Sequence, residues 1–503
     1  MDDNTPVIIG VGQVSERVGA DAYLERGPMD LAGDALAAAL ADAGARRKLA
    51  PALDTIAAIR QFEISGTRYG APFGHASNPP RAIAKRVGAR PQRAILEIVG
   101  GQGPQRLVGE LAAEIAAGRS KMAAVVGAEA MSTTRALVAR GAQRDWSEEL
   151  RGSIEDRGYG HSEVYDLALI RYGAGTPIAS YALAENVRRD RLGLSLEAYR
   201  LEIGRLFAPF TKVAAANPHA AAPVERSAVE LATLSERNRL VAEPYGRLVV
   251  ARDQVNQSAA VVLASVSEAR RLGVPENRWV HIHAVADCSE PSLLSRADLE
   301  LSPASVATIS TVLEVSETSW EKLDFIDLYS CFAIPVFNML DAFGLDRDDP
   351  RGWTLTGGLP FFGGPGNNYS GHAIAEAVAR CRAAPGSRAL VGANGGIMSK
   401  YAAGIYSTTP ADWSENRWNS LPRTAAAFRV LDDFEGDGVI DSFTIQPGKA
   451  GEVATIAGRT DDARFCANST DPAICAALRQ GKVAGRPVRV EESETGLNHF
   501  WFI

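Results

Sequence analysis

The sequence has few cysteines, and they are not arranged to form disulfides or bind zinc. Its 503 residues include five cysteines, an odd number, and no two of them stand in CxxC spacing. Disulfide frameworks use paired cysteines in short secreted chains, whereas isolated cysteines are typical of a reducing compartment. The five are Cys288, Cys331, Cys381, Cys466 and Cys475. We therefore expect a cytoplasmic protein without structural disulfides.

Long apolar runs and long basic runs are missing as well. No apolar stretch reaches the roughly 18 residues of a membrane-spanning helix, and the acidic residues 1–12 do not resemble a signal peptide. The formal net charge of −7 argues against a nucleic-acid partner. His281 and His283 alternate on an expected strand with no third ligand nearby, so no metal site is expected.

The order of apolar runs predicts a layered α/β protein of several domains. A chain of 503 residues is too long for one hydrophobic core. Runs of strand length alternate with amphipathic helices in the first 130 residues and again after residue 279. Both stretches share a strand-then-helix order, which suggests an internal duplication.

Shifts of composition divide the chain into five expected segments. The last of them alternates like β-strands between glycine turns, which favours a small barrel of the oligonucleotide/oligosaccharide-binding (OB) type. The segments are an N-terminal half (1–130 and 246–278), an inserted loop domain (131–245), a C-terminal half (279–412), a linker (413–435) and the OB-like β domain (436–503).

Residues 95–132 form the first of several informative motifs, since they read as strand, glycine turn, helix and strand. This segment resembles the one that thiolases, among them those of the sterol-carrier-protein type, carry around their nucleophilic cysteine, but here that position falls on Gly100. The sequence Tyr329-Ser330-Cys331-Phe332 is similar to the family's His-Asp-Cys-Phe, with tyrosine in place of histidine. The likeness therefore keeps the frame and changes the reacting groups.

Two further motifs follow in the family's order. Gly363-Gly364-Pro365 is similar to Gly-His-Pro, with Gly364 in place of the oxyanion-hole histidine. Residues 391–397 are similar to the loop that carries Cys-x-Gly in thiolases, with Asn394 near the place of its cysteine. The resemblance covers about residues 1–410. It implies a duplicated thiolase fold, layered αβαβα, with the loop domain inserted and the OB-like barrel added.

The resemblance also implies the ligand and the assembly. It points to an acyl-CoA enzyme of lipid metabolism that is similar to acetyl-CoA acetyltransferases. The expected substrate is a coenzyme A thioester, and no covalently bound cofactor is expected. The family's usual two-fold homodimer is expected, and the extra domain is expected to take the place of a separate partner subunit. Arg188 and Arg189, in the loop domain, are candidates for the nucleotide end of coenzyme A, although a solvated helix face is the alternative.

The altered motifs disfavour an acyl-cysteine and leave a lyase open. Glycine at position 100 cannot be a nucleophile. A retro-aldol step needs a base, a stabiliser of the enolate oxygen and an acid. Tyr329, the backbone amides around Gly364 and Gly395, and Cys331 are the candidates for these roles.

Two more residues are candidates for this site. His372 is a candidate for the missing imidazole and Asn394 for an oxyanion donor. Packing or turn geometry is the alternative explanation for each candidate residue. The alternative function is a non-catalytic acyl-CoA-binding or scaffold protein of thiolase fold.

Overall fold

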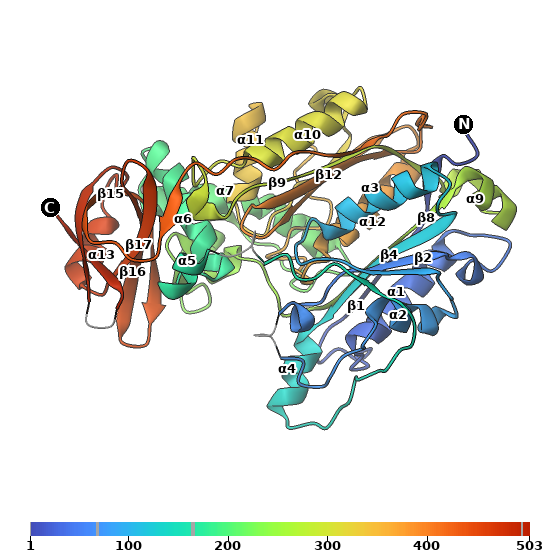
Figure 1. The fold of residues 1–503 in the computed structure, drawn as a ribbon, viewed down its shortest axis with the longest axis horizontal. Coiled ribbons are helices and arrows are strands. Elements are labelled where there is room, and N and C mark those ends of the chain that lie inside the picture. Colours follow the sequence, from blue (N-terminus) through green and yellow to red (C-terminus); the bar gives the residue numbers. More distant parts are fainter. Residues whose placement is uncertain (1, 67–69, 162–165, 494–495) are drawn as a thin grey trace.

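The computed structural model describes residues 2–66, 70–161, 166–493 and 496–503, and it consists of a layered α/β body, a helical insertion and a β-barrel (Figure 1). The barrel contains the C-terminus and lies at one end of the molecule, far from the N-terminus. Helices α5 (Leu167–Arg171) and α6 (Pro177–Arg191) lie between the barrel and the body. No helix of the described residues is long and apolar enough to cross a membrane.

Eleven strands of the described chain form one mixed sheet built from two halves. The N-terminal half has the order β3-β2-β4-β8-β1, with β5 at its outer edge, and the C-terminal half has the order β9-β12-β11-β10, with β13 beside β9. The halves meet where β1 pairs antiparallel with β9, through Val7 with His281 and Ile8 with Val280. The strands are β1 (Pro6–Glu16), β2 (Thr55–Ala58), β3 (Arg93–Leu96), β4 (Met122–Ala130), β5 (Glu155–Asp156), β8 (Asn256–Ser265), β9 (Val280–Ser289), β10 (Phe325–Asp327), β11 (Arg388–Gly395), β12 (Lys400–Ser407) and β13 (Trp418–Ser420).

Helices cover both faces of this sheet, which is why its central strands are apolar throughout. Every residue of β4 and β8 is buried, as expected for strands covered on both sides. Helices α3 and α12 contact strands of both halves and each other, so they form the middle layer. The helices of the body are α1 (Pro28–Asp42), α2 (Pro79–Val87), α3 (Gly103–Ala116), α9 (Val266–Leu272), α10 (Pro303–Val315), α11 (Ile334–Phe343) and α12 (Tyr369–Ala383). The predicted layered α/β fold is confirmed.

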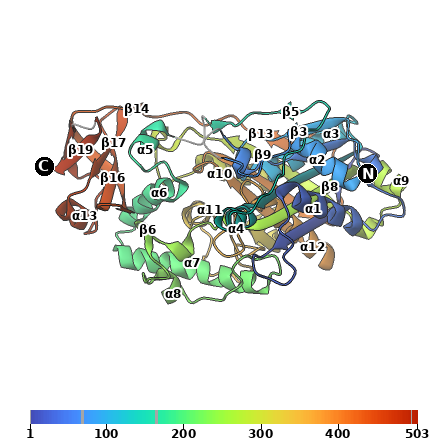
Figure 2. The ribbon, with the colours of Figure 1, turned by 90° about the horizontal axis from the view of Figure 1, so that it is seen from below.

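The insertion between β4 and β8 is mainly helical. Its two long helices begin at side-chain caps, because Thr176 accepts from the backbone N–H of Ala179 and Ser195 from that of Ala198. In the view turned by 90° (Figure 2), α7 and α8 lie along one edge of the molecule. Besides α5 and α6, the elements are α4 (Met131–Ala139), α7 (Leu196–Ala216), α8 (Ala228–Ala232), β6 (Leu240–Ala242) and β7 (Tyr245–Gly246).

The C-terminal segment is a closed barrel, as the sequence predicts. Strands β15 to β19 pair in the order β17-β16-β15-β18-β19, and Asn468 pairs with His499 to close β17 against β19. Helix α13 (Pro472–Leu478) lies between β17 and β18 along the chain. Strand β14 adds to the outside of β17. The elements are β14 (Arg429–Leu431), β15 (Gly436–Gly448), β16 (Gly451–Arg459), β17 (Ala463–Ser469), α13 (Pro472–Leu478), β18 (Pro487–Glu492) and β19 (Asn498–Phe502).

Buried hydrogen bonds fix the barrel to helix α6. The Asn186 side chain donates to the backbone oxygen of Phe443 at 2.9 Å, and the Ser442 hydroxyl donates to that of Leu183 at 2.6 Å. Asn186 and Ser442 are both buried. Because buried polar groups need such partners, the two surfaces are matched to each other. The barrel is therefore an integral part of the fold.

Candidate functional site

A two-glycine turn after β3 forms the centre of the candidate site. Gly100 has a φ of +141°, a conformation that residues with side chains rarely adopt. Its N–H donates to the side-chain oxygen of Asn367 at 2.9 Å, and its carbonyl accepts from the N–H of Gly103 at 3.0 Å, where α3 begins. The backbone conformation at position 100 therefore favours glycine, and a glycine at this position supplies no nucleophile.

The side chain of Gln102 fills the space that a side chain at position 100 would need. A Cβ atom added to Gly100 would overlap the Oε1 atom of Gln102, and so would one added to Gly395. The Gln102 carboxamide therefore lies between the turn and the end of β11. Gln102 is 2% exposed, and its Oε1 is buried without a hydrogen-bond partner. This part of the site could not accommodate an acyl-cysteine without rearrangement.

Tyr329 follows β10 and reaches the same turn. A Cβ atom on Gly101 would overlap its hydroxyl, so only glycine allows this approach. Within the described residues the hydroxyl makes no hydrogen bond. Burial raises the pKa of Tyr329 well above its usual value, and the nearby Cys331 raises it further. Tyr329 is therefore a neutral phenol whose proton is available to a ligand.

Cys331 lies beside Tyr329 and contacts groups from two other parts of the chain. The Asn394 side-chain nitrogen approaches its sulfur at 3.8 Å, and Tyr181 of α6 is also a neighbour. Burial raises the pKa of the Cys331 thiol to about 12, against the lowering effect of its hydrogen bonds. The residue is a neutral thiol, suited to giving a proton and unsuited to nucleophilic attack.

Tyr181 ties the helical insertion to the end of β11. Its hydroxyl accepts from the Asn394 side chain at 2.8 Å and from the N–H of Met398 at 3.2 Å, and it donates to the carbonyl of Gly396 at 3.0 Å. Its ring stacks on Phe332 with centroids 4.4 Å apart. Asn394 keeps a buried side-chain oxygen without a partner. Tyr181 thus holds the amide that contacts the thiol.

Four of the predicted residues therefore come together: Tyr329, Cys331, Asn394 and Gly395. Sequence reasoning missed two members of the cluster, Gln102 and Tyr181. The signal for Gln102 was its place inside the glycine turn. Nothing in the sequence distinguished Tyr181, which is 150 positions from Cys331 and belongs to a helix of the insertion.

The structure places His372 and Gly364 elsewhere. The His372 Nδ1 atom lies 2.7 Å from the side-chain oxygen of Gln13, and its ring meets Phe362 edge-on. Burial lowers the pKa of His372 well below its usual value, so the ring is neutral. Gly364 donates its N–H to the carbonyl of Arg252 at 2.8 Å. The contacts of His372 are therefore with β1 and Phe362 and not with Cys331, so the geometry gives no support to the prediction that His372 supplies the missing imidazole.

Both predicted arginines are occupied inside the protein. Arg188 forms a two-point ion pair with Asp341, at 2.9 and 3.0 Å, and lies 3.9 Å from the ring centre of Phe337. Arg189 is fully buried, pairs with Asp190 and lies over Phe443 of the barrel. Neither guanidinium is exposed to a nucleotide. The expectation that they bind coenzyme A is corrected to a structural role in packing α6.

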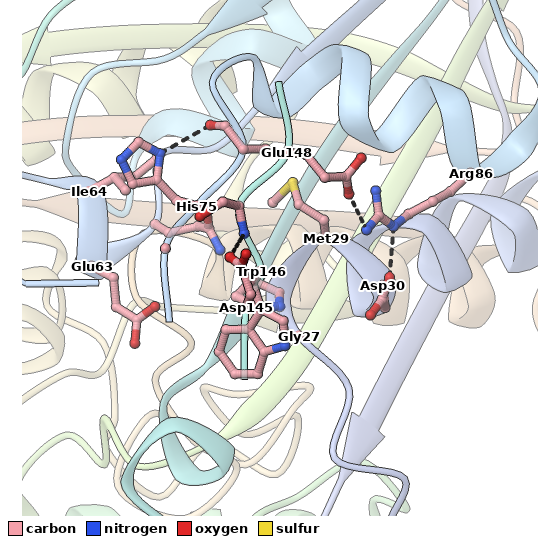
Figure 3. A pocket seen from close by; sticks show the side chains of 15 residues that line it. Gly27, Met29, Asp30, Glu63, Ile64, His75, Arg86, Asp145, Trp146 and Glu148 are labelled. Carbon is pink, nitrogen blue, oxygen red and sulfur yellow. Dashed lines mark hydrogen bonds and ion pairs between the residues drawn. The ribbon is translucent and has the colours of Figure 1, made fainter. Parts of the chain in front are cut away.

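A separate cavity of about 160 Å³ opens near α1 (Figure 3). Trp146, Glu63 and His75 line it, and at its rim Arg86 forms an ion pair with Asp30 at 2.8 Å. Its lining, as far as the chain is described, contains no residue of the Tyr329 cluster. The cavity is therefore distinct from the candidate site.

Comparison with known proteins identifies the family. A crystal structure of a monomeric SCP2-thiolase-like protein type 1 from Mycobacterium smegmatis is 41% identical in sequence, with a TM-score of 0.83, and the match covers 100% of both chains. The chain belongs to the SCP2-thiolase-like protein type 1 family. Residues 423–495 match the family model of the thiolase-like protein type 1 additional C-terminal domain. The predicted resemblance and fused barrel are confirmed.

More distant matches share the fold alone. An Ltp2-ChsH2(DUF35) aldolase is 19% identical, with a TM-score of 0.57, and the match covers 80% of this chain and 98% of the other. The dimeric peroxisomal thiolase of Saccharomyces cerevisiae is 14% identical, with a TM-score of 0.57, over 81% and 98%. No curated protein matches the chain. Because the 41% identical relative is monomeric, the expected two-fold dimer finds no support.

Proposed function

We propose that this member of the family acts on the C–C bond next to the thioester of an acyl-CoA, by a retro-aldol step and without an acyl-cysteine. One observation carries the proposal. The nucleophile position is Gly100, whose side-chain space Gln102 occupies, yet two neutral proton donors, Tyr329 and Cys331, lie close to this turn. The cluster therefore contains groups that can move protons and lacks the group that would hold an acyl chain.

The two neutral side chains suit a proton relay for a β-hydroxyacyl thioester. The substrate hydroxyl gives its proton to Tyr329, Tyr329 passes its own proton to Cys331, and Cys331 gives its proton to the α-carbon. The C–C bond breaks as the β-carbon becomes a carbonyl and its electrons form the enolate. Both residues end neutral, which agrees with burial raising the pKa of each. Tyr329 thus accepts the proton of the substrate hydroxyl at the same time as it gives its own proton to Cys331.

The relatives support the same proposal at the level of fold. One of the structures of this fold is an aldolase assembled with a DUF35 protein. In our proposal the fused barrel takes the place of such a separate subunit, since it is attached to α6, the helix that carries Tyr181. Strand β5 pairs with β3 and covers the outer edge of the sheet. We expect a monomer, which light scattering after size-exclusion chromatography checks.

The test is turnover of 3-hydroxyacyl-CoA thioesters followed by mass spectrometry. We expect a shortened acyl-CoA, an aldehyde or ketone, and one solvent deuterium at the new methyl or methylene group. Calorimetry with the same thioesters measures binding separately. Binding without any product, across a panel of acyl chains, would favour the non-catalytic acyl-CoA-binding protein, and no binding at all would remove the ligand class.

A further inference from the structure

The Gln102 side chain stands out among the buried polar groups of the site. Its Oε1 atom is enclosed against Gly100 and Gly395 and has no partner. Its amide nitrogen makes no hydrogen bond within the described residues and is not among the enclosed atoms. An unpaired buried amide costs about 1–3 kcal/mol. A glutamine that is 2% exposed is thus held with its nitrogen free for a partner from outside the chain.

The backbone donor expected at this turn is already in use. The N–H of Gly100 donates to Asn367, whose own amide donates to the carbonyl of Arg60 at 2.7 Å, so this pair is a closed structural link. A carbonyl oxygen bound at the turn therefore cannot use this N–H. The Gln102 amide and the Tyr329 hydroxyl both contact the Gly100–Gly101 turn and both lack a partner. The proposed relay passes the single proton of Tyr329 to Cys331, so the Gln102 amide is the side-chain donor left for the carbonyl.

The surroundings favour developing negative charge at this position. Gln102 is the residue that precedes the first turn of α3, a helix of 14 residues. The N-terminus of such a helix carries a partial positive charge that stabilises anions within the first turn. Side-chain amides aimed at a developing oxyanion are among the donors that enzymes use. An enolate oxygen beside Gln102 would receive both effects.

We propose that the Gln102 carboxamide donates a hydrogen bond to the thioester carbonyl oxygen of the substrate. The inference rests on the proposed function, since it requires a thioester ligand. It assigns Gln102 as a substrate-binding residue whose side chain lies beside Gly100, the position at which thiolases carry their nucleophile. When the thioester oxygen is bound by Gln102, the β-hydroxyl of the substrate is expected to lie toward Tyr329 and Cys331.

The experiment compares two coenzyme A compounds that differ only in the carbonyl oxygen. Calorimetry measures binding of butyryl-CoA and of the thioether S-butyl-CoA to the full chain and to Gln102→Met, which keeps the shape and removes the donor. We expect wild type to prefer the thioester about tenfold, the effect of roughly one hydrogen bond, and the variant to reduce the preference below about threefold. Infrared spectra of carbonyl-labelled butyryl-CoA should show a lowered stretch in wild type that returns toward the free value in the variant.

A matched control lies one turn further along α3. The Gln105 amide is buried and donates to the Tyr406 hydroxyl at 2.7 Å, so Gln105→Met should lower stability and leave the preference unchanged. If Gln102→Met does not fold, Gln102→Glu serves with the same readouts. An unchanged preference and carbonyl stretch in the Gln102 variant would overturn this inference alone, as would equal binding of both compounds by wild type. Binding of neither compound would overturn the proposed function with it.

Discussion

Replacing Tyr329 by phenylalanine should lower activity without lowering stability. Tyr329 is a buried residue whose hydroxyl has no partner among the described residues, so removal of the hydroxyl breaks no bond and lessens the cost of burying the side chain. We expect the free energy of unfolding to stay equal or to rise by about 1 kcal/mol. Loss of acid–base catalysis should reduce kcat by about 10²–10⁴-fold, equivalent to roughly 3–5 kcal/mol of activation free energy.

Tyr406→Phe is the matched control for this prediction. Tyr406 is also a buried tyrosine, but its hydroxyl exchanges hydrogen bonds with the Gln105 side chain at 2.7 and 2.9 Å. Its removal should cost about 1–3 kcal/mol of stability, because it leaves the glutamine unpaired, and should leave turnover unchanged. Both variants are measured by urea denaturation and by product formation. If Tyr329→Phe keeps full turnover or loses stability like Tyr406→Phe, the hydroxyl is structural and our reasoning fails.

Three further variants test other parts of the site. Gly100→Cys should lose stability, because φ at this position is +141° and the Gln102 side chain fills the space. Intact-mass spectrometry after incubation with acetyl-CoA should show no acetyl adduct, and an adduct would contradict the expectation that this position cannot hold an acyl-cysteine. Cys331→Ala should reduce turnover about 10²–10⁴-fold with acyl-CoA binding nearly intact by calorimetry; full turnover would exclude the thiol from the relay. Burial raises the pKa of Glu129 from 4.5 to about 8, so this group should make wild type lose stability as the pH rises between those values, by at most about 1.36 kcal/mol per unit. In urea melts across the same range, the stability of Glu129→Gln should fall less steeply with pH than that of wild type, and an equal slope would contradict the raised pKa.

The sequence allowed the fold and the frame of the site to be predicted, but not the direction of several side chains. His372 shows the reason. Ser370, two residues earlier on α12, donates its hydroxyl to the carbonyl of Gly101 at 2.7 Å and so faces the site. Two residues turn a helix by about 200°, which directs His372 to the opposite side, toward Gln13. A motif fixes where a residue lies along the chain, whereas the helical phase decides what it touches.

The burial of the arginines of α6 could not be predicted from the sequence for a related reason. A helix with several arginines near its end is typically a solvated face, or a surface for phosphate, when the helix is considered alone. Here the barrel and α11 pack on that helix, and Phe443 and Phe337 cover Arg189 and Arg188. Burial of a long side chain depends on which domain docks there. Local periodicity carries no information on that contact.

The pattern of unpaired polar groups distinguishes a working site from a decayed one. Loss of function without selection for binding would let buried polar groups be replaced by apolar ones or gain partners, since each unpaired group lowers stability. In this cluster the Gln102 and Asn394 oxygens and the Tyr329 hydroxyl all lack partners, and they surround the same turn and its neighbouring strand end. Their combined cost is reasonable where a ligand supplies the missing partners, which favours a ligand-binding site over a scaffold that binds no ligand.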